Sequence, residues 1–295
     1  MSGPEAEGTS GPEAGTSGPE AEGARGLRFG YGTNGFANHR LADALKVIAG
    51  LGYEGVALTL DHDHVDPYAE DAARQVARAA DLLRDLNLAV VVETGARYLL
   101  DPWHKHAPTF LHDERATRID FLKRAGDIAA DLGAEAVSFW AGVRPPELDD
   151  DTAWKRLVDG VAEVLGHATV PVGFEPEPGM LVNDIADWRR LNEDLGDPEL
   201  FGMTLDIGHC RAVEPLSVPD CVAGVREHLV NVQIDDMRRG VHEHLEFGAG
   251  EIDFPPVLDA LAGYTGLVAV ELPRHSHAAP DVARRSIEFL REAAR

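Results

Sequence analysis

Residues 116–140, ATRIDFLKRAGDIAADLGAEAVSFW, contain the repeating unit from which the fold is predicted. Apolar side chains recur three and four positions apart up to Leu132, which predicts an amphipathic helix. Gly133 follows the last turn, where glycine commonly ends a helix. The run from Ala136 to Trp140 is short and apolar, as is typical of a parallel strand covered on both faces.

The same alternation of short apolar runs and amphipathic stretches occurs eight times after Leu27. Eight βα units in one chain favour an α/β fold of the closed (β/α)8 TIM barrel type over an open doubly wound sheet. A G-x-G-x-x-G match, GYGTNG at 30–35, starts inside the predicted strand 27–32 and does not follow it, so a dinucleotide-binding fold has little support. The predicted strands are 27–32, 55–60, 88–93, 136–140, 170–175, 202–206, 229–234 and 267–271.

The first 26 residues differ from the rest in composition. They contain three near-copies of one motif, SGPEAEGT, SGPEAGT and SGPEAEGA, built only from Gly, Pro, Ser, Thr, Ala and Glu. Such a segment cannot bury enough apolar surface to offset its ordering entropy. We therefore predict a disordered acidic tail at 1–26 and a single-domain barrel at 27–295, a length that suits one barrel of roughly 250 residues.

The formal net charge is -24, from 27 basic and 51 acidic residues. This argues against broad contact with nucleic acid or an anionic membrane, since both require clustered Lys and Arg. No apolar stretch approaches the roughly 20 residues of a membrane span, and the N-terminus lacks a secretory signal pattern. The two cysteines, Cys210 and Cys221, lack the spacing of a disulfide framework. We expect a cytoplasmic protein.

Titratable side chains follow the predicted strands, where a TIM barrel carries its active site. Each has an ordinary structural alternative, such as a loop carboxylate or a helix cap. The strand-end residues are Glu93 and Tyr98 after strand three, Glu175 and Glu177 after strand five, Asp206 and His209 after strand six, Gln233, Asp235, Asp236, His242 and His244 after strand seven, and Glu271, His275 and His277 after strand eight.

Three of these carboxylates, Glu175, Asp206 and Glu271, end apolar runs. Three carboxylates at one mouth would repel one another strongly unless they shared a divalent metal. Mixed oxygen and nitrogen ligands suit Mn, Zn, Fe or Co better than Ca. The sequence therefore predicts a divalent-metal site, with Mn, Zn, Co or Mg as candidate ions.

The ordered motifs at these positions resemble the xylose isomerase-like TIM barrel superfamily. They are Glu-Pro-x-Pro-Gly at 175–179, Asp-x-Gly-His at 206–209, the strand-seven motif with its His-x-His loop at 242–244, and the terminal Glu271. The superfamily includes sugar isomerases and epimerases and the endonuclease IV group, and the resemblance covers the chain from about Leu27. It implies Glu175, Asp206 and Glu271 as metal ligands, with the two glutamates also exchanging protons with the substrate.

The resemblance also implies that His209 is a catalytic residue that contacts the substrate or the metal. Gln233 stands where the family usually has a strand-seven histidine, and an amide is a weaker donor than imidazole. The fourth ligand is therefore left open among Gln233, His242 and His244. Trp140 stands where nucleases of this group carry histidine, so the number of metals is left open as well.

The predicted activity is metal-dependent isomerisation or epimerisation of a sugar, sugar phosphate or cyclitol by proton transfer through an enediolate. Candidate substrate contacts are Glu93, Tyr98, Arg238 and Arg239, with surface solvation weighing equally for the two arginines. Phosphate recognition has little support, because no Gly-rich phosphate loop is found and the loops after strands seven and eight offer only Arg238, Arg239 and Arg274. The stretch 95–114 is too long for a simple βα link, which predicts a lid, a packed surface loop being the alternative.

Two other functions are compatible with the same residues. A metal-dependent hydrolase or phosphoesterase of the endonuclease IV-like group would use them to activate water with two or three metals. A non-catalytic pathway-accessory barrel would follow if the Gln233 departure abolished the chemistry. The expected partner is a small sugar-like molecule, with no nucleic acid and no membrane, and homo-oligomerisation is left open.

Overall fold

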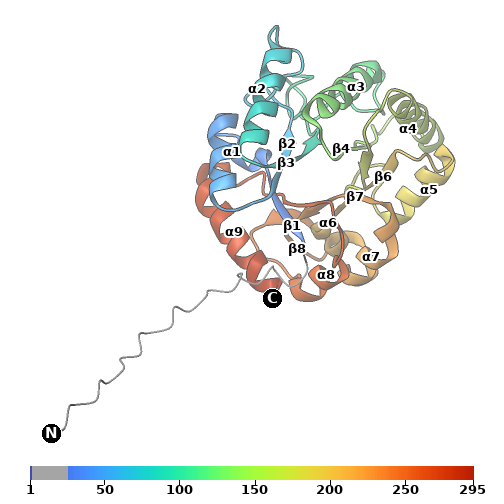
Figure 1. Ribbon diagram of the computed structural model, residues 1–295. Helices are drawn as coiled ribbons and strands as arrows, with labels where there is room; N and C mark the ends of the chain where they lie inside the picture. Colours follow the sequence, from blue (N-terminus) through green and yellow to red (C-terminus); the bar gives the residue numbers. More distant parts are fainter. Residues whose placement is uncertain (2–25) are drawn as a thin grey trace.

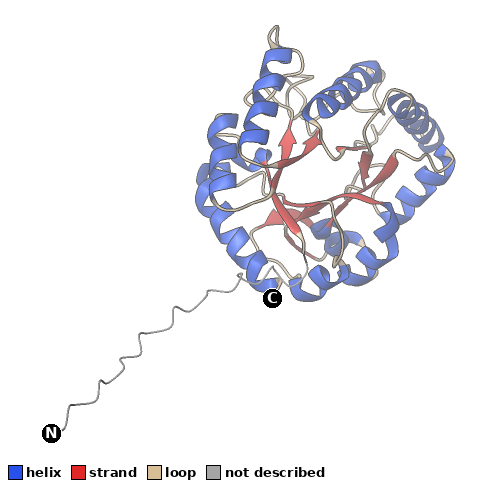
Figure 2. Cartoon of the chain, viewed as in Figure 1, coloured by secondary structure: helices blue, strands red, loops and turns tan. Residues whose placement is uncertain are grey.

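The eight apolar runs of the sequence form the eight strands of one closed parallel barrel. The computed structural model describes Met1 and residues 26–295, so the predicted tail at 1–26 lies almost wholly outside the described residues. The predicted TIM barrel is confirmed (Figures 1 and 2). Its strands are β1 (Arg28–Gly32), β2 (Gly55–Thr59), β3 (Ala89–Glu93), β4 (Val137–Trp140), β5 (Val172–Glu175), β6 (Phe201–Asp206), β7 (Leu229–Ile234) and β10 (Leu267–Val270).

Helices follow the strands and form an outer ring, drawn in blue around the red strands in Figure 2. Gly133 adopts φ +65° directly after α3, as its position in the sequence predicts. No described helix is long and apolar enough to cross a membrane. The helices are α1 (Leu41–Gly50), α2 (Ala72–Asp85), α3 (Arg115–Leu132), α4 (Asp150–Leu165), α5 (Ile185–Leu195), α6 (Ile207–Val213), α7 (Val218–Val225), α8 (Phe254–Ala260) and α9 (Ala279–Ala293), with 3-10 turns η1 (Thr33–Phe36), η2 (Arg226–His228) and η3 (Ser276–Ala278).

The strand order around the barrel is β1-β10-β7-β6-β5-β4-β3-β2. The first and last strands close the ring through parallel pairs that include Arg28 with Leu267 and Tyr31 with Val270. Figure 1 shows α1 in blue beside α9 in red at this seam, where the two helices are in contact. Because all eight strands run in one direction, their C-terminal ends meet at a single mouth.

A short hairpin covers part of this mouth. It consists of β8 (Asp236–Arg238) and β9 (Val241–Leu245), an antiparallel pair outside the barrel sheet. The sequence predicts a loop for the His-x-His motif at 242–244, so the hairpin is an addition to the predicted fold. The β8 strand packs against α6, with Met237 fully buried. The hairpin therefore holds the His-x-His motif at a fixed place beside the strand ends.

Candidate active site

Three carboxylates from different strands meet at the mouth of the barrel. Glu175 ends β5, Asp206 ends β6 and Glu271 directly follows β10. One oxygen from each lies within 4.8 Å of the other two. Glu175 and Asp206 are buried and Glu271 is partly exposed. The predicted convergence of these three side chains is therefore seen in the geometry.

Asp206 both caps a helix and faces the carboxylate group. Its Oδ1 accepts a hydrogen bond of 2.8 Å from the backbone N–H of His209, which caps the first turn of α6. Its Oδ2 is buried and has no hydrogen-bond partner in the described part of the chain. A buried carboxylate oxygen without a hydrogen-bond donor is energetically unfavourable. A cation bound to Oδ2 would remove this cost.

Gln233 lies next to Asp206 in the barrel. The two residues are paired in register between β6 and β7, and Gln233 is also paired with Ala269 of β10. The Gln233 amide oxygen is buried and, among the described residues, it accepts no hydrogen bond. Gln233 therefore presents an available oxygen between the strands that carry Asp206 and Glu271.

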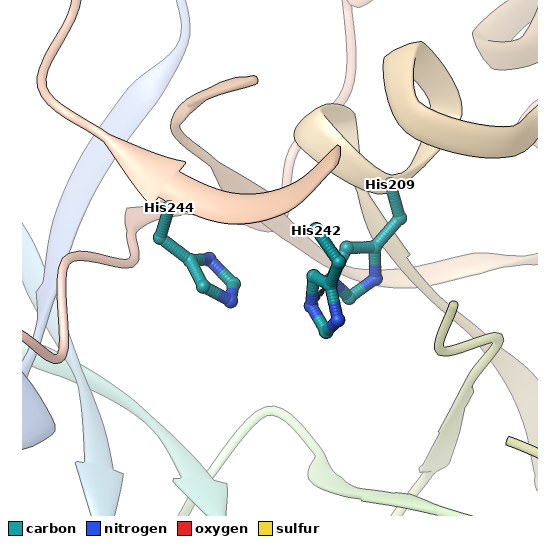
Figure 3. A group of neighbouring side chains, drawn as sticks. All are labelled: His209, His242 and His244. Atoms are coloured by element: carbon teal, nitrogen blue, oxygen red, sulfur yellow. Dashed lines mark hydrogen bonds between the residues drawn. The ribbon is translucent and has the colours of Figure 1, made fainter. Parts of the chain in front are cut away.

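A second group beside the carboxylates consists of three histidines. His209 comes from α6, and His242 and His244 come from β9. Figure 3 shows the rings of His209 and His242 close together and that of His244 extending from the hairpin toward the same space. The Nε2 atoms of His209 and His242 are 3.1 Å apart, and the ring centroids of His242 and His244 are 5.4 Å apart.

The tautomer of His209 follows from its hydrogen bond to the backbone. Its Nδ1 donates to the Pro176 carbonyl at 3.1 Å, which leaves the Nε2 lone pair available when the ring is neutral. Burial lowers the pKa of His209 to about 3, so the ring is neutral over the physiological range. His209 Nδ1 also lies 3.5 Å from Glu175 Oε1, and His209 thereby packs directly behind a cavity carboxylate.

Two further acids complete the site, and the sequence assigned neither a role. Glu177 Oε1 lies 3.4 Å from His242 Nε2. Asp235 is fully buried, and its carboxylate makes a close ion-pair contact with His244 Nδ1 that lacks hydrogen-bond geometry. Ligand atoms of Asp206, Asp235 and His244 also fall within 4.8 Å of one another. The mouth therefore contains overlapping groups of oxygen and nitrogen donors.

Burial and mutual repulsion shift the ionisation of these acids. Burial, reinforced by neighbouring carboxylates that include Glu177 and Glu271, raises the pKa of Glu175 well above its usual range. Burial likewise raises the pKa of Glu271 to about 7, and the pKa values of Glu93 and Glu177 to about 8. The carboxylates cannot all be charged at neutral pH unless a cation compensates them.

The donors open into a cavity of about 510 Å³, a size suited to a small-molecule ligand. Of the predicted site residues, Glu93, Glu175, Gln233, His242, His244 and Glu271 line it; Asp206 and His209 are not in its wall and lie against residues that are. The remaining lining residues are Asn34, Thr59, Gly95, Arg97, Lys105, His106, Trp140, Glu177, Met180, Pro273 and Arg274.

Three predicted substrate contacts do not reach this cavity. Tyr98 is 48% exposed and is not among the lining residues. The Arg238 guanidinium donates to the Ala249 carbonyl at 2.8 Å, and that of Arg239 donates to the carbonyl of Glu214. Both arginines are exposed on the hairpin, donate to backbone carbonyls and lie outside the lining of this cavity.

The loop at 95–114 contributes to the cavity instead. It contains no helix or strand and supplies the lining residues Gly95, Arg97, Lys105 and His106. The His106 ring donates to the Gly95 carbonyl at 2.6 Å, which ties the two ends of this lining segment together. Closure of the loop as a lid stays a prediction, but its place in the wall is clear.

Residues outside the predicted ligand and substrate-contact sets support the site. The Asn34 amide donates to Glu271 Oε1 at 2.9 Å, and the Asn231 amide donates to Glu93 Oε1 at 3.2 Å inside the barrel. Trp140 lines the cavity with the buried Arg118 guanidinium 4.5 Å from its ring centroid. Only Trp140 had a sequence signal, its position at the end of a strand.

Comparison with known proteins agrees with this architecture. The L-ribulose-5-phosphate 3-epimerase UlaE of Escherichia coli is 28% identical over 231 residues, which cover 74% of this chain and 80% of that protein. A crystal structure of D-allulose 3-epimerase from Methylomonas sp. has a TM-score of 0.71 at 18% identity, covering 90% of this chain and 98% of that chain. The IolI protein, solved with a zinc atom, has a TM-score of 0.70 at 18% identity, with coverage of 90% and 98%.

At such low identities, the two structural matches show the fold alone. The family assignment depends instead on a sequence model, that of the xylose isomerase-like TIM barrel, which matches residues 45–293. This match spans seven of the eight barrel strands, β2 to β10, and every strand-end residue described above. The resemblance inferred from the motifs is thereby confirmed, and the chain belongs to the xylose isomerase-like TIM barrel family.

Proposed function

We propose that this protein is a divalent-metal-dependent isomerase or epimerase that moves a proton at the carbon next to a carbonyl group. The substrate class is a sugar, sugar phosphate or cyclitol. The observation that carries the proposal is the group formed by Glu175, Asp206 and Glu271, whose oxygens lie within 4.8 Å of one another at the barrel mouth. Acids this close need a shared cation to remain charged.

The residues present fit a divalent cation. Asp206 Oδ2 and Gln233 Oε1 are buried acceptors that no donor among the described residues satisfies. In this proposal Glu175, Asp206, Glu271 and Gln233 hold the metal, with His242 or His244 as the alternative fourth ligand. Such oxygen and nitrogen donors suit Mn, Zn, Co or Mg. When bound, the metal stabilises negative charge that develops on the carbonyl oxygen of the substrate.

Glu175 and Glu271 are the proposed base and acid. They enter the cavity from β5 and β10, which β6 and β7 separate in the barrel, so they can approach a flat enediolate from two sides. Both carboxyl groups line the cavity, where they can take a proton from a bound substrate or return one, as acid–base catalysis requires. The Asn34 amide, 2.9 Å away, orients Glu271.

His209 is a positioning residue in this scheme. It lies behind Glu175 rather than in the cavity wall, and its neutral ring is fixed by the Pro176 carbonyl. The named relatives support the proposed reaction class, since the curated relative from Escherichia coli is a sugar phosphate 3-epimerase. The zinc atom in the IolI structure supports a metal in a barrel of this kind.

Isotope exchange tests the proposal directly. Turnover of ketoses, their phosphates and cyclitol ketones in deuterated water should place deuterium on the carbon next to the carbonyl. Glu175→Gln and Glu271→Gln keep the side-chain shape and remove the base, so each should lower kcat by about 100-fold or more. Glu227→Gln is the matched control, because Glu227 is exposed on η2, away from the cavity. Product without carbon-bound deuterium would exclude the enediolate route.

A hydrolase is the second candidate, and one observation favours it. His209, His242 and Glu177 bring two imidazole nitrogens 3.1 Å apart and a carboxylate oxygen 3.4 Å from the second, beside the carboxylate group. Two adjacent donor sets are typical of multi-metal hydrolases. A hydrolase would incorporate solvent oxygen-18 into its product, with no carbon-bound deuterium, and would bind more than one metal per chain by elemental analysis.

A further inference from the structure

Three cationic side chains line the same cavity as the carboxylates. Arg97 and Lys105 come from the loop between β3 and α3, and Arg274 comes from the loop after β10. The acids enter from the strand ends and from the segment that follows β5. The cavity wall therefore combines an acidic part at the barrel mouth with a cationic part built by two loops, in a chain whose net charge is -24.

The cavity acids do not neutralise these cations by direct pairing. Within the described residues, Lys105 forms no hydrogen bond and no ion pair, and the Arg97 guanidinium donates to the Asn34 carbonyl at 3.0 Å. Arg274 pairs with Glu243 at 3.2 Å, but the Arg274 side chain is 66% exposed and that of Glu243 is 44% exposed. Such a surface pair contributes little stability and is easily exchanged for a better partner.

Both arginines lie close enough to Lys105 to affect its charge. Partial desolvation lowers the pKa of Lys105, and the positive charges of Arg97 and Arg274 lower it further, with a smaller opposing effect of Glu177. Gathering like charges at a cavity wall is unfavourable unless an anion binds there. Two guanidinium groups and an ammonium match the oxygens of a phosphate or carboxylate.

Asn34 connects the cationic part to the proposed proton-transfer pair. Its backbone carbonyl accepts from Arg97, and its side-chain amide donates to Glu271 at 2.9 Å. An anion held by Arg97 would thus lie beside the carboxylate group without entering it. One small molecule can then present its carbonyl end to the carboxylates and its anionic end to the loops.

We propose that Arg97, Lys105 and Arg274 form a subsite for an anionic group of the substrate, a phosphate ester or a carboxylate, so that the substrate is an anionic sugar. That the anionic substrate is a sugar rests on the proposed function, but the anion subsite itself can be tested independently of that function. Arg97 and Lys105 replace Arg238 and Arg239 as the groups that hold the anionic end.

The first experiment measures binding of inorganic phosphate to the full-length protein by calorimetry. Lys105→Met keeps the apolar stem and removes the charge, and it should weaken phosphate binding by about tenfold or more, as expected for a lost charge-assisted hydrogen bond. Lys46→Met is the matched control, because Lys46 is an exposed lysine on α1 that does not line the cavity. Its phosphate affinity should stay within about twofold of wild type, the scale of a distant surface charge.

The second experiment compares three ligands under turnover conditions: a ketopentose 5-phosphate, a ketose carrying a carboxylate, and the neutral ketopentose. Wild type should prefer an anionic ligand in kcat/KM, and Lys105→Met should reduce that preference by about tenfold. The anion whose advantage falls more identifies the group that the subsite holds. Arg274→Gln should reduce the same preference.

The outcomes separate the two proposals. Equal phosphate affinity in wild type and Lys105→Met, or no wild-type preference for either anionic ligand over the neutral ketopentose, would overturn the subsite. If phosphate binding requires Lys105 but no sugar gains deuterium from solvent, the proposed function fails and the anion subsite stands.

Discussion

The two carboxylate oxygens of Asp206 have different proposed roles, a helix cap and a metal ligand, and a single substitution can separate these roles. Oδ1 caps α6 through the His209 N–H at 2.8 Å, and Oδ2 is buried with no hydrogen-bond donor among the residues that the structure describes. Asp206→Asn keeps an oxygen for the cap and loses the charge. We expect it to weaken metal binding by about 100-fold or more, beyond the change produced by altering outer residues of a metal site, with little change in Tm.

Elemental analysis and thermal unfolding of the same samples check this expectation. Asp206→Ala should also lose the cap and about 1 kcal/mol of stability. Asp131→Asn serves as the control, since Asp131 is an exposed aspartate near the end of α3. Full metal content in Asp206→Asn would remove Asp206 from the proposed ligands.

Gln233 is one of the candidates for the fourth metal ligand, and a substitution there tests it. Its buried amide oxygen, next to Asp206 in register, accepts no hydrogen bond from any described residue. If this oxygen is a ligand, Gln233→His should raise metal affinity by about tenfold, because imidazole is the better donor for Zn or Co. A competition titration with a chromophoric chelator measures this. An unchanged affinity, together with metal loss in His244→Ala or His242→Ala, would show that the fourth ligand is a hairpin histidine and not Gln233.

At the scale of elements, the strands were predictable and the loops were not. The run ending at Glu175 can be recognised as a strand from its own short apolar sequence. A parallel barrel then brings its end to the same mouth as Asp206 and Glu271. By contrast, Lys105 lies in a 20-residue stretch, 95–114, whose path depends on contacts with distant segments, such as Arg97 with Asn34. The hairpin was missed because β9 is mostly polar and partly exposed and lacks an apolar run.

The hairpin is held by Asp236, a carboxylate that is among the predicted strand-end residues but not among the candidate ligands. Asp236 accepts backbone N–H bonds from Gly248, Gly250 and Ile252 at 2.9, 2.9 and 3.1 Å. A Cβ on Gly250 would lie 2.2 Å from Asp236 Oδ1, so the segment after β9 wraps closely around this acid. Asp236 therefore organises the hairpin base, which fixes where His242 and His244 lie.

Asp236→Ala leaves these backbone donors without their acceptor. We expect a loss of about 1–3 kcal/mol in the free energy of unfolding, because Asp236 is buried and its three hydrogen bonds from partly buried backbone N–H groups are lost, and weaker metal binding if a hairpin histidine is a ligand. Urea unfolding followed by circular dichroism gives the first quantity. Asp131→Ala, in which an exposed carboxylate is removed, should change it by no more than about 0.5 kcal/mol, and a similarly small effect of Asp236→Ala would contradict the proposed role of this acid.

For the whole molecule, the domain boundary proposed from composition is testable by truncation. The barrel closes through β1, which starts at Arg28, and residues 2–24 offer no large apolar side chain. A chain beginning at Gly26 should therefore keep the Tm of the full protein within measurement error. A fall of several degrees would show that the N-terminal segment contributes to the stability of the barrel.

Charge balance at the mouth should link metal binding to global stability through pH. In the metal-free protein, burial raises the pKa of Glu271 to about 7 and those of Glu93 and Glu177 to about 8, from a usual value of 4.5. Because their pKa values are higher in the folded protein than in the unfolded chain, these groups stabilise the folded state while they are protonated. Their contribution is fully present below the unfolded pKa and is lost as pH rises through about 7 to 8.

Metal supplies the compensating charge, so the loaded protein should not lose this stability. We expect the Tm difference between loaded and chelator-treated protein to grow between about pH 5 and pH 8, reaching about 5 °C or more at the upper end. Surface charges affect both forms equally and cancel in the difference. Differential scanning fluorimetry at matched ionic strength measures it, with Asp206→Asn as a variant that should show little difference at any pH. If the Tm difference is constant or shrinks as pH rises, the cation does not stabilise the protein by compensating the charges of the buried carboxylates at the barrel mouth.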